Sequence, residues 1–133
     1  MANVVPNAFK GELLSGTHNF ASGGDSFKLA LYTANPYTTS STAYSSGAGN
    51  EVSGSAAGYS TGGSALTSQA VASSTATASV DFANLTFSSA TFSAAFGAIY
   101  NDDKSDKLVV ILDFGGTKTA TNGDFTIAFP DPS

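Results

Sequence analysis

The side chain with the clearest capacity for acid–base chemistry is His18, the one histidine in the chain. A histidine that acts as a catalytic base needs a nucleophile and an orienting carboxylate close to it in space. Ser and Thr are so frequent here, with 20 and 15 residues, that a hydroxyl group near His18 would carry little meaning. We therefore expect a solvated or helix-capping histidine, and we assign no catalytic residue. An enzyme would need a cleft that unites His18 with acidic side chains.

The acidic residues and glycine pairs offer little metal or phosphate chemistry. With no Cys and one His, a zinc site would depend on carboxylates for its other ligands. Asp102, Asp103 and Asp106 share one polar turn, but they lack the bidentate Glu and the loop length of a calcium-binding EF-hand. Gly62-Gly63 and Gly115-Gly116 lack the Lys and the spacing of a phosphate-binding loop. We expect no metal, no cofactor and a solvated hairpin turn at the three aspartates.

The most distinctive segment is the glycine-rich loop Glu51–Leu66. Its glycines, Gly58, Gly62 and Gly63 among them, permit a positive φ or a close approach of two backbones. Between them, Tyr59 carries a large ring with a polar tip. Two interpretations stay open: Tyr59 packs into its own domain, or it contacts a partner, because tyrosine is enriched at interfaces for the same physical reason.

Composition restricts the classes of partner. The net charge is −5 and the chain contains no Arg, so it would repel a phosphate backbone and lacks the usual reader of base edges. The longest run of large apolar residues, Leu108–Leu112, is far shorter than the ~20 residues of a membrane-spanning helix. The range Met1–Pro6 lacks the charged start and apolar core of a signal peptide. We expect no direct contact with nucleic acid or membrane, and synthesis in a cytoplasm without export.

Alternation of apolar and polar residues along the chain predicts an all-β domain, on which the candidate side chains described above would lie. The expected strands are Ser26–Thr33, Ala78–Phe87, Ala90–Tyr100, Lys107–Phe114 and Gly123–Phe129, with Pro130 ending the last. A change of phase at Ala83-Asn84 indicates a bulge or a bend. Leu108–Phe114 is apolar on both faces, which is typical of a strand in the middle of a covered sheet.

Two connections are predicted to be hairpin turns. They are the polar segment Asn101–Asp106 and the dipeptide Asn122-Gly123, which tolerates positive φ. Short strands joined by such turns predict a jelly roll, a sandwich or a small barrel. We expect its core to contain Leu29, Leu31, Phe82, Phe96, Ile99, Ile127 and the strand Leu108–Leu112.

Two stretches fit this β domain less closely. Residues 1–20 are expected to form an N-terminal arm or a short helix, and residues 21–133 a single β domain. Within that domain, residues 34–79 are rich in Ser, Thr and Gly and are expected to be partly loop, with a candidate strand at Leu66–Val71. We expect this region to be partly ordered in the free chain and to gain the rest of its order from a partner.

Seven segments carry a likeness to a known class of proteins. In chain order they are Lys28–Thr33, Asn50–Gly54, Gly58–Gly63 with Leu66, Val80–Ala83, Ala98–Asn101, Leu112–Gly116 and Asn122–Ile127. From about residue 9 onward, the chain resembles the small virion structural proteins of tailed bacteriophages, in particular head decoration (cement) proteins. Many members carry a Trp after the Asp-Phe-Ala segment, whereas Phe87 stands in that region here. The additional Ser55–Ala57 lengthens the loop before Gly58.

The resemblance implies a non-enzymatic, jelly-roll or sandwich-like virion protein that bridges and stabilises capsid subunits. Its implied partners are the major capsid protein and copies of itself, and its implied location is the virion. A decoration protein stabilises the assembled shell by binding it through mass action. The candidate contact residues are Phe9, Leu13, Leu14, Phe20, Glu51, Gly58, Tyr59, Gly62 and Gly63. The alternatives are a tail or neck component and a carbohydrate-binding surface module, although the absence of Trp disfavours the latter.

Overall fold

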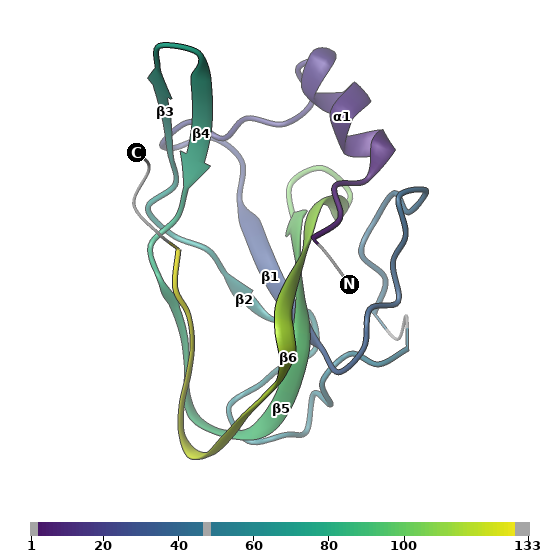
Figure 1. The fold of residues 1–133 in the computed structure, drawn as a ribbon, viewed down its shortest axis with the longest axis vertical. Coiled ribbons are helices and arrows are strands. Elements are labelled where there is room, and N and C mark those ends of the chain that lie inside the picture. Colours follow the sequence, from purple (N-terminus) through teal and green to yellow (C-terminus); the bar gives the residue numbers. More distant parts are fainter. Residues whose placement is uncertain (1–2, 47–48, 130–133) are drawn as a thin grey trace.

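The computed structural model describes residues 3–46 and 49–129 of the chain. Over these residues the elements are α1 (Asn7–Leu14), β1 (Phe27–Tyr32), β2 (Ser64–Ala65), β3 (Ala70–Ser74), β4 (Thr77–Asp81), β5 (Leu85–Asn101) and β6 (Lys107–Ile127). Four strands form an antiparallel sheet in the order β2-β1-β5-β6, and β3 and β4 form a separate antiparallel hairpin (Figure 1). This architecture confirms the predicted all-β class. Met1, Ala2 and Pro130, which entered the expectations for the arm and the last strand, lie outside the described residues.

Strand β1 runs through the middle of the core and is covered on both faces. Its alternation places Phe27, Leu29 and Leu31 in one apolar cluster, while Ala30 and Tyr32 belong to a second cluster. All five side chains are fully buried. Burial of a large apolar side chain contributes about 1.5–3 kcal/mol, so this six-residue strand is a major source of the stability of the sheet.

Strands β5 and β6 form one long, bent ribbon instead of two separate hairpins. The turn at Asn101–Asp106 joins them, as predicted. The prediction of a second hairpin turn at Asn122-Gly123 is wrong, because β6 continues through these residues and Gly123 pairs with Ala90. Asn122 has a φ of 49° beside a shift of register, so its tolerance of positive φ serves a β-bulge.

Strand β6 is the edge of the sheet, which corrects the expectation that Leu108–Phe114 lies in its middle. Its apolar residues nevertheless serve both clusters, with Leu108 and Ile111 in one and Val109 in the other. Its outer edge is covered at Ile111, where the Val4 backbone exchanges two hydrogen bonds of 2.9 and 2.8 Å with it. A strand can therefore be apolar on both faces without having a strand on both sides.

Most of the predicted core is confirmed. The buried members are Leu29, Leu31, Phe82, Ile99, Leu108, Val109, Ile111 and Ile127, whereas Phe96, Val110 and Leu112 are half-buried. The change of phase at Ala83-Asn84 corresponds to a complete break, since β4 ends at Asp81 and β5 begins at Leu85. This break allows the β3–β4 hairpin to leave the main sheet.

Candidate functional site

His18 lies in a buried polar network, which corrects the expectation of a solvated or capping histidine. Its side chain is fully buried, and its Nε2 lies 2.7 Å from Glu12 Oε2. Its Nδ1 lies 2.9 Å from Asn101 Nδ2, which also donates to Asp25 Oδ2 at 2.9 Å. Because an amide nitrogen only donates, Nδ1 must accept, and the ring hydrogen on Nε2 is donated to Glu12. Through Nδ1 the ring thus links the arm to the end of β5, and through Nε2 it is held to Glu12 of α1 within the arm.

The same network gives Asp25 an unusual electrostatic setting. Burial by itself would raise the pKa of the Asp25 carboxyl group, but hydrogen bonds from Asn101 and Asn19 and the positive charge of Lys104 outweigh it. The net effect is a pKa below the ordinary value. The carboxylate form therefore stabilises the folded chain at neutral pH.

The three aspartates of the β5–β6 turn differ in their roles. Asp103 accepts a 2.7 Å hydrogen bond from the Ser26 amide and so fixes the start of β1, which corrects the picture of a purely solvated turn. Asp102 lies 3.6 Å from Lys28 Nζ. Burial and the nearby Asp102 charge raise the pKa of Asp106. Across residues 3–46 and 49–129, no group of three or more acidic or histidine side chains is placed to hold a metal ion.

The glycine-rich loop is held to the sheet by Glu51 and Tyr59. Glu51 accepts hydrogen bonds from the Tyr59 hydroxyl at 2.7 Å, the Gly62 amide at 2.8 Å and the Tyr44 hydroxyl at 3.0 Å. The Tyr59 hydroxyl also accepts from the Leu31 amide at 3.1 Å, and the ring is buried between phenylalanines. In the free chain, Tyr59 is therefore a packed core residue with both sides of its hydroxyl group engaged.

Two glycines of this loop lie where a side chain would collide with the sheet. A Cβ at Gly63 would overlap the backbone of Leu29, and one at Gly58 would approach the backbone of Ala90 to 2.8 Å. Both residues also have positive φ values, of 78° and 83°. Their lack of a side chain lets the loop lie directly on β1 and β5.

The candidate contacts of the arm divide into two groups. Phe9 is buried, and Phe20 stacks on Phe27 with ring centroids 4.5 Å apart, so both join the core. Leu13 and Leu14 lie at the end of α1 and are 47% and 92% exposed. The structure thus presents the two leucines, but not the two phenylalanines, on the surface.

Sequence reasoning did not identify the β3–β4 hairpin, which projects from the end of the molecule that also carries α1 (Figure 1). All residues of β3 are exposed, and Val71 and Val80, which pair directly, are 58% and 40% exposed. Its two-residue loop, Thr75-Ala76, has none of the Gly or Asn residues that identify a hairpin in a sequence. The remaining sequence indication that this segment lies outside the core was the lack of large apolar residues around Val71.

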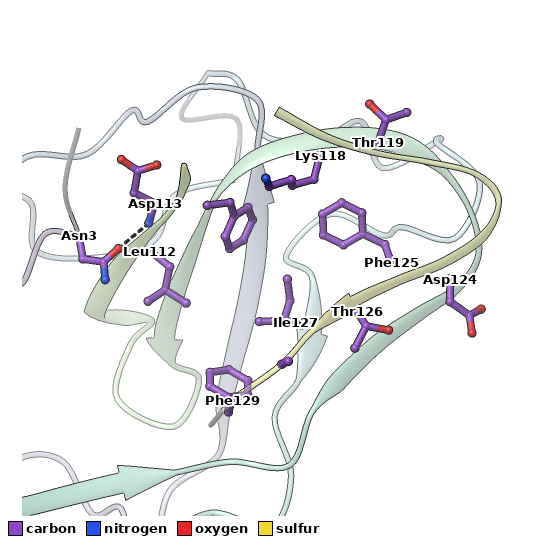
Figure 2. A pocket seen from close by; sticks show the side chains of 12 residues that line it. Asn3, Leu112, Asp113, Lys118, Thr119, Asp124, Phe125, Thr126, Ile127 and Phe129 are labelled. Atoms are coloured by element: carbon purple, nitrogen blue, oxygen red, sulfur yellow. Dashed lines mark hydrogen bonds between the residues drawn. The ribbon is translucent and has the colours of Figure 1, made fainter. Parts of the chain in front are cut away.

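A hollow of about 590 Å³ lies between the first part of β6, around Leu112 and Phe114, and its last part, around Phe125 and Ile127 (Figure 2). Its apolar lining comes from Leu112, Phe114, Phe125, Ile127 and Phe129, and its polar lining includes Asn3, Asp113, Lys118 and Asp124. Asn3 Oδ1 accepts a 2.7 Å hydrogen bond from the Asp113 amide at one rim. The hollow is an opening into the larger apolar cluster, because Phe125 and Ile127 belong to that core.

Neither a search for membrane-spanning helices nor comparison with known proteins adds an indication of function. Within the part of the chain described by the structure, no helix has the length and apolar character needed to cross a membrane. The sequence matches no protein-family model, no curated protein and no solved structure.

Proposed function

We propose that this chain is a non-enzymatic structural protein of a bacteriophage virion, in which it decorates the capsid and bridges neighbouring subunits. The proposal starts from the resemblance of its sequence segments to decoration proteins. Its partners are the major capsid protein and further copies of the chain, without direct contact to nucleic acid or membrane. A jelly-roll or sandwich arrangement of the sheet is part of the same proposal, since apolar clusters cover both of its faces.

The observation that carries the proposal is the exposure of Leu13 and Leu14 on a helix that is otherwise fixed to the body. Glu12 holds α1 through His18 on one side and through Lys107, at 3.4 Å, on the other. Phe9, in the first turn of the helix, is buried in the core. Because the helix that carries the two leucines is already attached to the body, binding does not have to order its backbone, which favours their use as a contact surface.

The surface around these leucines suits a protein that must cover a large assembly. Charged residues are 11% of the chain, and hydroxyl side chains supply much of its polarity. Small hydroxyl side chains lose less rotamer entropy than Lys or Glu when a partner covers them. In the glycine-rich loop, where Tyr59 is buried, the exposed serines and Gly58 would make such contacts.

A binding experiment with capsid shells tests the proposal. Shells assembled from the phage's own major capsid protein are mixed with the purified chain and sedimented. We expect co-sedimentation, and a loss of at least roughly tenfold in affinity for Leu13→Gln/Leu14→Gln, because two exposed leucines would no longer be covered. Gln keeps a helix propensity close to that of Leu, so α1 should persist.

Lys10→Gln on the same helix is the matched control and should bind like the unmodified chain. Equal binding by the double variant would remove the leucines from the interface. Binding to isolated tails instead of shells would move the chain to the tail or neck. Binding to glycans, with none to shells or tails, would support a carbohydrate-binding module.

A further inference from the structure

The β3–β4 hairpin is fixed at its base and unsupported along its length. Gln69 Nε2 donates to the carbonyl oxygens of Ala21 and Asp25 at 3.0 and 2.9 Å, and the Ala83 amide donates to Thr67 at 2.9 Å. Beyond this base, β3 and β4 pair with each other and with no other strand among residues 3–46 and 49–129. A two-stranded hairpin alone is marginally stable in water, whereas three or more strands with an apolar face are stable.

Among the described residues, the β3 edge of this hairpin lacks the features by which proteins prevent strand pairing. Edge strands are usually protected by charged side chains, Pro, bulges or a covering segment. The range Ala70–Val80 contains no charged residue and no Pro, and the register of β3 with β4 is unbroken. By contrast, the edge of β6 is covered at Ile111 by Val4. In the described part of the chain, therefore, the β6 edge is covered at Ile111, whereas the β3 edge is left open.

We infer that the hairpin joins two copies of this chain, through antiparallel pairing of the β3 edge of one copy with the β3 edge of the other. This inference rests on the proposed function, because a decoration protein meets further copies of itself on the shell. The pairing would extend two strands to a four-stranded sheet, in which the Val71 and Val80 side chains of both copies line one face.

The distribution of charge in the chain favours a second copy as the partner that binds the β3 edge. Each chain carries a net charge of −5, so two copies repel each other wherever their acidic surfaces approach. Strand β3 carries no charged residue and the one charge of the hairpin, Asp81, lies at the base of β4, so pairing along β3 lets two copies meet at a projecting element away from most of their carboxylates (Figure 1). A basic partner would find no acidic side chain between Ala70 and Val80 to bind. Pairing of identical edges also gives a closed two-fold dimer.

The register of the hairpin determines how the two copies would align. In a hairpin with a two-residue loop, the residues that flank the loop and every second residue from them bond to the partner strand. Counting from Ser74, this leaves the amide and carbonyl groups of Val71 and Ser73 directed outward. A two-fold axis at Ala72 then pairs Val71 of each copy with Ser73 of the other and places the two Ala72 residues side by side.

The first test measures self-association of the free chain by sedimentation velocity over a range of concentrations. We expect a monomer–dimer equilibrium that Ser73→Glu weakens by at least roughly tenfold, since like charges would lie in neighbouring strands. Ala78→Glu is the matched control, because Ala78 pairs with Ser73 but lies on the other strand. It should leave the dimer intact. Far-ultraviolet circular dichroism checks that both variants fold.

The second test uses the absence of cysteine from the chain. Under mild oxidation, Ala72→Cys should form a covalent dimer, whereas Ser74→Cys, two residues away on the same face, should not. The inference would be overturned if the chain stayed monomeric at all concentrations. It would also be overturned if Ser73→Glu and Ala78→Glu weakened the dimer equally, or if Ala72→Cys and Ser74→Cys cross-linked equally. If the chain dimerises but binds no capsid shell, the capsid role is rejected and the pairing is kept. If the chain binds shells but stays monomeric, the pairing is rejected and the capsid role is kept.

Discussion

The glycine-rich loop Glu51–Leu66 and the hairpin β3–β4 have similar compositions and opposite structural roles. Both consist largely of small residues, which are Ser, Thr and Ala in the hairpin and include Gly in the loop, and both contain few large apolar residues. The loop is nevertheless held to the sheet by one aromatic ring and one carboxylate that accepts three hydrogen bonds. The hairpin has no such residue between Ala70 and Val80, and it projects from the body. Anchoring side chains, which the loop has and the hairpin lacks, therefore separate two segments of otherwise similar composition.

The largest expected effect comes from the glycine that lets the loop lie against β1. Gly63→Ala should lower the free energy of unfolding by more than about 3 kcal/mol, because its Cβ would overlap the Leu29 backbone. Gly115→Ala is the control: its φ of 77° matches the 78° of Gly63, but no atom of the described residues lies within 4 Å of the added Cβ. Its cost should be about 1–2 kcal/mol, from backbone conformation alone. Equal costs in urea unfolding would show that the loop does not need this close approach.

The second effect separates the two tyrosines that bind Glu51. Tyr59→Phe should cost about 1–3 kcal/mol, because the buried Leu31 amide and Glu51 Oε1 both lose a partner. Tyr44→Phe removes one hydrogen bond to the same carboxylate in a half-buried position and should cost about 0.5–1.5 kcal/mol. Urea unfolding of the two variants measures the difference. A Tyr44→Phe cost as large as that of Tyr59→Phe would mean that Glu51, and not the buried Tyr59 hydroxyl group, dominates the attachment.

Sequence patterns predicted the elements that have strong periodicity. β1 alternates residue by residue, and its two faces supply two apolar clusters, as a period of two requires. The turn after Asn101 was identified by its run of polar residues. Asn122-Gly123 has the same local preference for positive φ in a turn and in a bulge, so the dipeptide could not distinguish the two.

The candidate site was less predictable, because it depends on contacts between residues far apart in the sequence. Asn101 and His18 are separated by 83 positions, and no local pattern reveals that they share a buried hydrogen bond. The exposure of Leu14 is also a tertiary property, since the arm contains four apolar candidates of which two are in the core. Composition identified the arm and the loop as distinctive, but it could not show which side chains reach the surface.

Acid titration tests the base of the hairpin, where Asp25 accepts from Asn101 and its carbonyl oxygen accepts from Gln69. The pKa of Asp25 is below the ordinary value of 3.8, so the folded state binds this proton more weakly than the unfolded chain. The resulting stability is present above about pH 4 and is lost as the pH falls through the lower folded pKa. Asp25→Asn should therefore reduce stability at neutral pH and flatten the decline below about pH 4.

Asp106→Asn should change the stability at neutral pH in the opposite direction. The pKa of Asp106 is raised by burial and by Asp102, so its charged form opposes folding above that pKa. Asn also tolerates the positive φ of 57° at this position. The variant should gain up to about 0.5 kcal/mol at neutral pH, a small gain because the site is partly solvated. Urea midpoints measured from acid to neutral pH give both curves, and a loss of stability in Asp106→Asn would contradict the assigned direction.

The smallest effect is expected in the hairpin itself. Val71→Ala, measured by urea unfolding at concentrations where the chain is monomeric, should change the free energy of unfolding by less than about 0.5 kcal/mol. Val71 is 58% exposed, and its side chain lies on a hairpin that pairs with no other strand that the structure describes. Val52→Ala makes the same truncation in the glycine-rich loop, where Val52 is 5% exposed within the core. Removing its two buried methyl groups should cost about 1.5–2 kcal/mol.

Hydrogen exchange sharpens this last comparison, because it reports local opening. Amides in the hairpin should exchange through local opening, well before global unfolding, whereas the Leu31 amide, bound to the Tyr59 hydroxyl group, should exchange only with the core. At high concentration the pairing inferred above should slow exchange at Val71 and Ser73, whose groups point outward, and leave Leu31 unchanged. If Val71→Ala destabilised the monomer as much as Val52→Ala, the hairpin would be part of the cooperative core. Its open edge would then no longer distinguish it from the loop.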